Sequence, residues 1–226
     1  MAGMPGGIGN TGFECGGITS PLVILGLRHG LREMHAGLPL IFDQGHAYCQ
    51  HFSNENAASF CKAIQNPRFP VRCIHAVRHS PELLAETLEN DNRSAIPADQ
   101  REAYSHLYDH LKQNNFHCAH AVFQNLGNTV PVNQELLDAT SAFMGGTLFK
   151  GLTCSAFTAG VMAIGLKIGE IENSYLRVTR MLAIMVSGGY AFNDEVNKFN
   201  RALNTGHRLS KWFRTEFGSA QCQAIT

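Results

Sequence analysis

The sequence predicts an all-α protein, a helical bundle made of two related units. Two observations predict the fold class: apolar residues recur with the 3.6-residue spacing of helices, and no segment shows the alternating pattern of a half-buried strand. A third predicts the two units, since a segment containing glycine and cysteine near the N-terminus recurs 139 residues later. Asn, Asp, Ser and Pro gather at residues 90–97, so we expect unit 1–95 to meet unit 96–226 there.

Helices are expected where strong helix formers or apolar residues keep helical spacing. In segment 158–167 small residues alternate with Val, Ile and Leu, which is typical of a buried helix that packs closely on its neighbours. Ser80, Asn133 and Asn193 are expected N-caps, because their side-chain oxygens accept hydrogen bonds from free N–H groups at a helix start. The other expected helices are 81–89, 97–112, 116–126, 134–143, 173–186 and 193–217.

Charge and hydropathy exclude several classes of partner. The 18 Lys and Arg residues balance 18 Asp and Glu residues, so no basic field is expected that would bind nucleic acid. Apolar stretches such as 157–166 are shorter than the about 20 residues that span a bilayer. The first residues lack a charged and then apolar leader, so we expect a cytoplasmic protein.

Seven cysteines and eleven histidines direct attention to metal or redox chemistry. The cysteines are odd in number and scattered, which disfavours a secreted disulfide scaffold. No C-x-x-C occurs, which removes a local thioredoxin-type pair, a zinc ribbon and covalent haem attachment. Any cysteine site must therefore be assembled by folding, and scattered cysteines are otherwise small buried apolar residues.

The internal repeat is centred on Cys15 and Cys154. Within 25 positions, eight residues are identical without a gap, and five of them are glycines. A second anchor follows, since residues 61–64 (CKAI) resemble residues 222–225 (CQAI), with 22 more residues between the anchors in the second copy. The identical pairs are Gly6 and Gly145, Gly7 and Gly146, Gly12 and Gly151, Cys15 and Cys154, Thr19 and Thr158, Gly26 and Gly165, Leu27 and Leu166, and Gly30 and Gly169.

The repeated residues have two interpretations, one chemical and one structural. A glycine loop lets the backbone approach a bulky inorganic group and point N–H groups at thiolates, so Gly12 and Gly151 are candidate cofactor-binding residues. We expect each cysteine to start a helix, which places Thr19 and Thr158 one turn later, where a hydroxyl can donate to the sulfur or to other metal ligands. The alternative is helix capping and tight glycine packing without a cofactor.

The cysteine pattern resembles the C_GCAxxG_C_C family of redox-active proteins, to which the non-haem part of split-Soret cytochrome c is also similar. The family's leading cysteine helix resembles residues 116–122 around Cys118, and its glycine loop and C-G-A-x-x-G resemble residues 145–160 around Cys154. Its third cysteine, after F-G-S, resembles Cys222 after residues 217–219.

In the first copy, Cys15 and Cys61 occupy the second and third family positions, and Cys73 resembles the trailing cysteine. Each copy thus has three of the four family cysteines. The resemblance implies a redox protein with an iron–sulfur cluster, [2Fe–2S] or [4Fe–4S], and the metal ligands Cys15, Cys61, Cys73, Cys118, Cys154 and Cys222. No covalent haem is implied.

Three thiolates do not complete a four-cysteine shell, so each site needs a fourth ligand from another residue, a partner chain, solvent or substrate. A homodimer and a protein redox partner are therefore expected. An imidazole ligand would raise the cluster potential and couple reduction to protonation. The candidates within the chain are Cys49, His29, His46, His51, His117, His120 and His207.

Two other functions use the same residues. Thiolates and imidazoles also suit a zinc- or copper-binding structural or metal-handling module, and neighbouring cysteines suit a thiol–disulfide oxidoreductase. The pairs His75 with His79 and His106 with His110 have metal-capable spacing, which is often incidental on a solvated helix. Hydrolase and nucleotide-binding motifs are absent from the sequence.

Overall fold

The computed structural model describes residues 4, 6–31, 37–65, 71–93, 95–113, 117–169, 179 and 201–225. Over these residues the chain is all-α, with two isolated bridges and no strand, as predicted. The helices are α1 (Gly16–His29), α2 (Leu38–Asn56), α3 (Cys61–Ile64), α4 (Val71–Asn90), α5 (Ala98–Gln113), α6 (Cys118–Asn125), α7 (Gln134–Thr140), α8 (Ser155–Ile168) and α10 (Arg201–Phe217), with the 3₁₀ turns η1 (Ser141–Phe143) and η3 (Cys222–Ala224).

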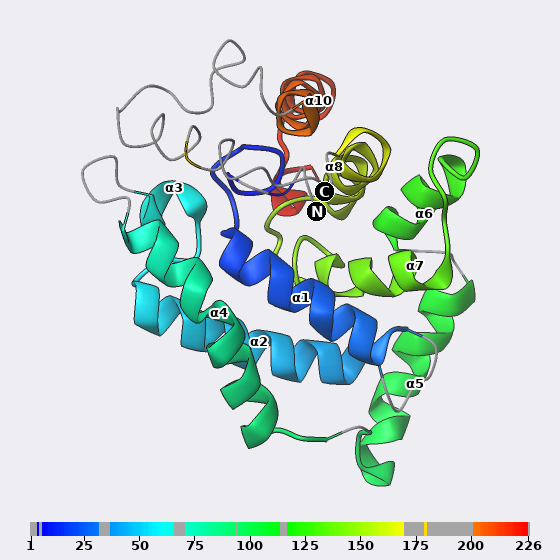
Figure 1. Ribbon diagram of the computed structural model, residues 1–226. Helices are drawn as coiled ribbons and strands as arrows, with labels where there is room; N and C mark the ends of the chain where they lie inside the picture. Colours follow the sequence, from blue (N-terminus) through cyan, green and yellow to red (C-terminus); the bar gives the residue numbers. More distant parts are fainter. Residues whose placement is uncertain are drawn as a thin grey trace.

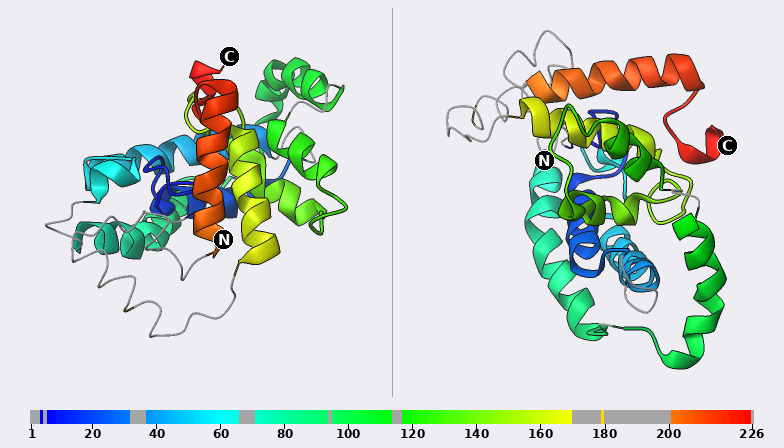
Figure 2. Two further views of the ribbon diagram at one scale, coloured as in Figure 1. Left: turned by 90° about the horizontal axis from the view of Figure 1, so that it is seen from above. Right: turned by 90° about the vertical axis from the view of Figure 1, so that its right-hand side faces the viewer.

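Helix α1 lies at the centre of the bundle, and most of its residues are buried (Figure 1). It packs against α2 and α4 on one side and against α7 on another. Helix α8 contacts α6 and α10, and α10 lies alongside α8 across one end of the molecule (Figure 2). The two helices that follow the repeated cysteines therefore each have their own set of helical neighbours.

Most helix boundaries agree with the sequence. Helices α1 and α8 begin directly after Cys15 and Cys154, and the Asn133 side chain caps α7 by accepting a bond from the Leu136 N–H at 2.9 Å. Helix 173–186, apart from residue 179, and the cap Asn193 lie outside the described residues.

The expected cap at Ser80 is wrong. Ser80 lies inside α4, which starts at Val71 and continues through Pro81. The Ser80 hydroxyl donates instead to the Gly17 carbonyl of α1 at 2.8 Å, so its hydrogen bond joins two helices. Helix α2 was also missed, because its apolar residues are interrupted by polar ones; it buries Gln44 as well as Tyr48 and Phe52.

The glycine loops, residues 6–12 (first glycine loop) and 145–151 (second glycine loop), have the same backbone geometry. Residues 6, 7, 8, 9, 10 and 12 have positive φ, as do 145, 146, 147, 148, 149 and 151, each 139 places later. The bond from the Gly12 N–H to the Gly6 carbonyl (2.9 Å) recurs from Gly151 to Gly145 (3.1 Å). Positive φ disfavours residues with a Cβ, which explains why glycine recurs at 6 and 145, at 7 and 146, and at 12 and 151.

Each glycine loop packs on helices of the other half of the chain. A Cβ on Gly9 would lie 2.8 Å from Phe157 and 2.9 Å from Val161, both on α8. Leu148, in the second glycine loop, is buried against α1 and α2, where a Cβ on Gly45 would lie 2.9 Å from it. The two loops are thus exchanged between the halves.

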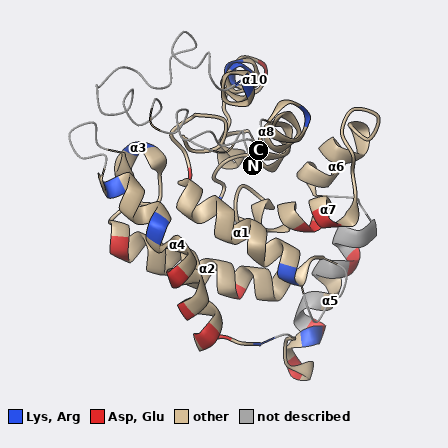
Figure 3. Cartoon of the chain, in the orientation of Figure 1, with Lys and Arg blue, Asp and Glu red and all other residues tan. Residues whose placement is uncertain are grey.

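Charged residues lie on the outside of several helices. Figure 3 shows Lys and Arg distributed over separate elements, with acidic residues along α2 and α4. Among the described helices, none combines the length and the hydropathy that a membrane crossing requires.

Candidate functional site

Six of the seven cysteines form two groups, which we call the first triad (Cys15, Cys61 and Cys73) and the second triad (Cys118, Cys154 and Cys222). In the first triad, an isolated antiparallel bridge joins Glu14 and Phe60, the residues before Cys15 and Cys61. The Cys15 N–H donates to the Ser59 carbonyl at 3.0 Å, and the Cys61 N–H donates to the Phe13 carbonyl at 2.6 Å. Cys73 reaches the pair from the first turn of α4, which packs on α3.

The second triad repeats this arrangement. The bridge joins Thr153 and Gln221; the Cys154 N–H donates to the Ala220 carbonyl at 2.9 Å, and the Cys222 N–H to the Leu152 carbonyl at 2.6 Å. Cys118 completes the group from the start of α6, which packs on α8. Relative to the first triad, the residues around Cys154 are shifted by 139 positions and those around Cys222 by 161.

The thiols of each triad influence one another electrostatically. Burial, and then negative charge at Cys15 and Cys73, raise the pKa of Cys61 to about 12. Burial, and then charge at Cys154 and Cys118, raise the pKa of Cys222. The backbone bonds bring Cys15 to Cys61 and Cys154 to Cys222, and these electrostatic effects agree with Cys73 and Cys118 lying near the two pairs.

The triads differ in exposure. Cys15 and Cys61 are 2% and 7% exposed, whereas Cys118 is exposed and Cys154 and Cys222 are partly exposed. The structure describes all seven cysteines, and none of them forms a disulfide bond. Cys73 is partly exposed, so the first triad is more shielded from solvent than the second but is not sealed from it.

The first turn of α1 is fixed beside Cys15. Pro21 has no N–H, which leaves the Gly17 carbonyl one turn earlier without its helical donor. The Tyr48 hydroxyl of α2 and the Ser80 hydroxyl of α4 both donate to this carbonyl. The Gly17 N–H, in turn, points at the Cys15 Sγ at 3.4 Å, as expected for a group that stabilises negative charge on sulfur.

Replacing Tyr48 with Phe is expected to lower the free energy of unfolding by about 1 kcal/mol, the usual net value of a buried hydrogen bond. The ring stays in place, and Ser80 still donates to the Gly17 carbonyl. Urea denaturation of wild type and Tyr48→Phe measures the difference. The exposed Glu86→Ala on the same helix as Ser80 is the control, and equal stability of wild type and Tyr48→Phe would show that this bond does not fix the turn.

Gly12 and Gly151 lie against the chain segments that carry the third cysteines. A Cβ on Gly12 would lie 3.0 Å from the Lys62 Cβ, and one on Gly151 would lie 2.7 Å from the Gln223 Cβ. Thr158 donates back to the Cys154 carbonyl at 3.2 Å. Thr19 is fully buried, and its hydroxyl has no hydrogen-bond partner in the described part of the chain.

The candidate fourth ligands differ in the hydrogen bonds that their side chains already form. Both ring nitrogens of His117 are used, since Nε2 bonds to the Thr140 carbonyl at 3.0 Å and Nδ1 accepts from the Ala119 N–H at 3.2 Å. Burial, and then the charge of His120, lower the pKa of His117 to about 3, so the ring stays neutral. His117 is therefore the N-cap of α6 and is not available to a metal.

In the described part of the chain, each of the other candidate histidines forms at most one ring-nitrogen hydrogen bond. Cys49 is buried on α2, and this burial raises its pKa to about 11. The charge of Lys150 lowers the pKa, and the charge of Glu14 raises it. His207 has a buried Nδ1 without a partner among the described residues. One hydrogen bond each links His29 to Gln44, His46 to the Leu148 carbonyl and His120 to the Leu137 carbonyl.

The described residues contain no preformed single-ion site. Within the described ranges, no group of three or more His, Cys, Asp or Glu side chains could hold a metal ion. The rings of His75 and His79 lie with their centroids 4.2 Å apart and tilted by 36° on α4, and His79 bonds to Glu82. His106 is exposed, and the side chain of His110 lies outside the described part.

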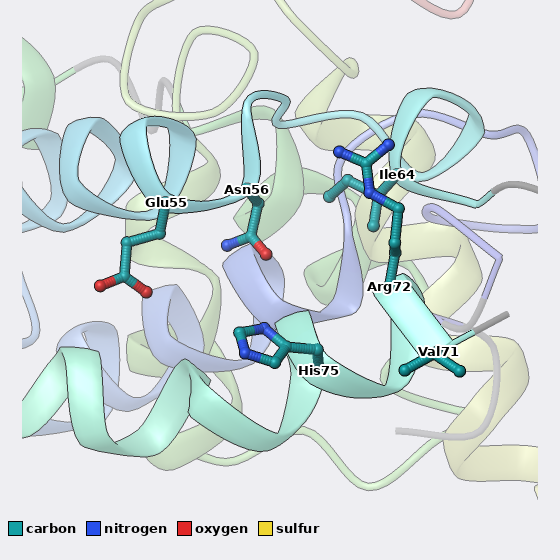
Figure 4. A pocket seen from close by; sticks show the side chains of 6 residues that line it. All are labelled: Glu55, Asn56, Ile64, Val71, Arg72 and His75. Carbon is teal, nitrogen blue, oxygen red and sulfur yellow. The ribbon is translucent and has the colours of Figure 1, made fainter. Parts of the chain in front are cut away.

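An open pocket of about 220 Å³ adjoins the first triad (Figure 4). Its walls come from the end of α2, from α3, which begins at Cys61, and from the start of α4, which carries Cys73. The His75 ring lies toward Asn56, and the Arg72 side chain passes beside Ile64 (Figure 4). The described lining of this pocket contains no cysteine, although Ile64 and Arg72 lie close in sequence to Cys61 and Cys73.

In metal-free, reduced protein, iodoacetamide is expected to modify Cys118 fastest and Cys15 and Cys61 slowest. Only thiolate reacts, and a pKa of about 12 keeps Cys61 protonated at pH 8. Below that pKa, the Cys61 rate should rise about tenfold per pH unit. Mass spectrometry of labelled peptides measures the rates, and labelling in urea is the control. Equal native rates at Cys61 and Cys118 would contradict the burial difference.

Sequence reasoning missed Glu14. This carboxylate is 1% exposed and accepts three hydrogen bonds, all from residues around the second glycine loop. The signal for burial was weak, since a lone Glu before a cysteine is usually solvated. The sequence does contain one useful sign: Glu14 and Thr153, which bond to each other, occupy equivalent positions of the repeat.

Comparison with known proteins gives one match. Residues 116–226 match the family model described as "Putative redox-active protein (C_GCAxxG_C_C)", which includes the whole second triad. No curated protein and no solved structure matches the chain.

Proposed function

Residues 116–226 belong to the C_GCAxxG_C_C redox-active family, and from this premise we propose that the chain is an electron-transfer protein with one iron–sulfur cluster at each cysteine triad. The observation that carries the proposal is the repeated geometry, in which the same backbone bonds bring a loop cysteine and a C-x-A-I cysteine together twice. The cluster at the first triad would be held by Cys15, Cys61 and Cys73, and that at the second by Cys118, Cys154 and Cys222.

The donor set fits such a cluster. A tetrahedral zinc ion with Zn–S bonds of about 2.3 Å needs sulfur atoms about 3.8 Å apart. In a [4Fe–4S] cluster each thiolate binds a different iron, and in a [2Fe–2S] cluster the ligands are divided between two irons, so the sulfur atoms span a wider site. The paired backbone bonds and the effect of the thiols on one another's pKa support one shared centre at each triad.

The surrounding residues support a redox role for the first triad. When bound, a cluster supplies one-electron transfer. The Gly17 N–H stabilises charge on the Cys15 sulfur, and burial of Cys15 and Cys61 excludes water. The unpartnered Thr19 hydroxyl is the donor that we assign to a group bound there, and Gly12 and Gly151 allow the loops to approach the cysteine segments. Thr158 is the equivalent residue at the second triad.

We propose further that the two halves, 1–95 and 96–226, are copies of one unit. The constant offsets of 139 and 161 residues for equivalent bonds support this view. Each copy has three of the four family cysteines, so a fourth ligand comes from solvent, substrate, a histidine or a second subunit of a homodimer. The mass in solution, measured together with the metal content, tests the dimer. A monomer with full metal content would show that no second subunit is needed.

The proposed location is the cytoplasm, where reducing conditions keep thiols free. A protein redox partner would meet the open second triad. The thiol–disulfide alternative is weaker, because burial raises the pKa of Cys15, Cys61, Cys73, Cys118 and Cys222, and the thiolate is the nucleophile in exchange.

Anaerobic purification tests the proposal. We expect brown protein with iron and acid-labile sulfide in comparable amounts. Zinc or copper without sulfide would support the metal-handling module instead. Colourless protein whose alkylated cysteine count changes reversibly with reductant would support the thiol oxidoreductase.

A further inference from the structure

Glu14 connects the two halves of the molecule through a buried carboxylate. Its Oε1 accepts from the Thr147 hydroxyl at 2.8 Å and from the Thr153 N–H at 3.1 Å, and its Oε2 accepts from the Thr153 hydroxyl. Glu14 belongs to the first half, and all three donors belong to the second. A buried carboxylate is costly unless its oxygens are hydrogen-bonded, so these bonds hold Glu14 in one position.

Each end of this contact is covalently joined to a site cysteine. Glu14 precedes Cys15, and Thr153 precedes Cys154. Both cysteine N–H groups are bonded in turn, to Ser59 and Ala220, as described above. Neither backbone segment can shift without disturbing the Glu14–Thr153 bonds.

Because Glu14 and Thr153 are equivalent in the repeat, their contact lies where the two copies meet face to face. The exchanged glycine loops surround this point, with Gly9 against α8 and Leu148 against α1 and α2. Thr147, the other residue that donates to Glu14, belongs to the second glycine loop itself. The contact therefore joins both loops as well as both cysteines.

We propose that Glu14 is a positioning residue for both triads. This inference rests on the proposed function of the triads. It assigns to one side chain of the first half a role in organising the thiols of the second half. Outer residues that orient metal ligands typically change metal affinity by about 10- to 100-fold when they are removed.

The experiment measures Cd²⁺ affinity at each triad separately, from thiolate-to-metal absorption at pH 8. Protein with Cys118→Ala and Cys222→Ala retains the first triad, and protein with Cys61→Ala and Cys73→Ala retains the second. In both backgrounds, Glu14→Ala is expected to lower Cd²⁺ affinity about tenfold. Loss at the first triad alone, or at neither, would overturn the proposal.

The conservative variant separates positioning from general destabilisation. In Glu14→Gln the amide oxygen still accepts from the Thr147 hydroxyl and the Thr153 N–H, and the amide nitrogen donates to the Thr153 hydroxyl. We expect Glu14→Gln to restore affinity to within about threefold of the parent at both triads. Glu86→Ala, an exposed change on α4, should leave both affinities unaltered. Failure of Gln to restore affinity would count against hydrogen-bond positioning.

A second measurement needs no metal. Amide exchange of the Cys15 and Cys154 N–H groups in metal-free protein should become faster in Glu14→Ala at both positions, while α5 amides are unchanged. Faster exchange at Cys15 alone would overturn the proposal. If Cd²⁺ binds neither parent, iron and sulfide analysis tests the cluster function separately, and amide exchange still decides the role of Glu14.

Discussion

Cys61→Ala protein, reconstituted with excess iron and sulfide, should contain about half the wild-type iron and acid-labile sulfide, because one of two three-thiol sites has lost a ligand. Cys222→Ala should give the same result through the other site. Combining Cys61→Ala with Cys222→Ala should remove nearly all iron and the visible absorption. Iron and sulfide assays with absorption spectra measure these changes.

Cys49 supplies the matched control. It is buried like Cys61, yet its electrostatic neighbours are Lys150 and Glu14, and no triad thiol is among the groups that shift its pKa. Cys49→Ala should therefore keep the full iron content. Iron content that is unchanged in the combined Cys61→Ala and Cys222→Ala protein would refute the assignment of both triads.

Gly146→Ala should unfold the second triad and cost about 3–5 kcal/mol in the free energy of unfolding, as the sum of left-handed strain and overpacking. Gly146 has φ +74°, and an added Cβ would lie 2.6 Å from the Cys222 Cβ and 2.7 Å from the Leu152 nitrogen. The backbone there cannot yield without breaking the bond from the Cys222 N–H to the Leu152 carbonyl. Urea denaturation and the Cys222 labelling rate measure the effect.

Gly218→Ala separates the two parts of that cost. Gly218 has nearly the same φ, +75°, but no atom lies within 4 Å of an added Cβ. We expect a loss of about 1–2 kcal/mol from strain alone, with unchanged labelling of Cys222. Equal losses at Gly146 and Gly218 would show that the close approach to Cys222 does not matter.

Local rules predicted the all-α class and many helix boundaries, because they depend on neighbouring residues. The cap at Asn133 and the helix starts after Cys15 and Cys154 follow from one turn of sequence. The predicted N-cap at Ser80 was wrong because a serine before Pro-Glu is typical of a cap. In the fold its hydroxyl instead donates to a carbonyl of another helix.

The grouping of the thiols was predictable from the repeat and the family resemblance, since both point to the same cysteines. The exchange of the glycine loops was not predictable, because a positive-φ loop can pack on its own unit or on its neighbour. In hindsight the Gly-His pairs at 45–46 and 206–207 mark it, since they are offset by 161 residues and both contact the opposite loops.

The exchanged loops also decide what a shortened chain could do. A fragment ending near residue 95 would keep Leu22 and Gly45 but lose Leu148, which fills the space between α1 and α2. Proteolytic cleavage between α4 and α5 should consequently leave two pieces that remain associated, whereas either piece made alone would expose an apolar groove. Dissecting the two halves genetically is thus a harder route to a one-centre protein than changing single cysteines within the intact chain.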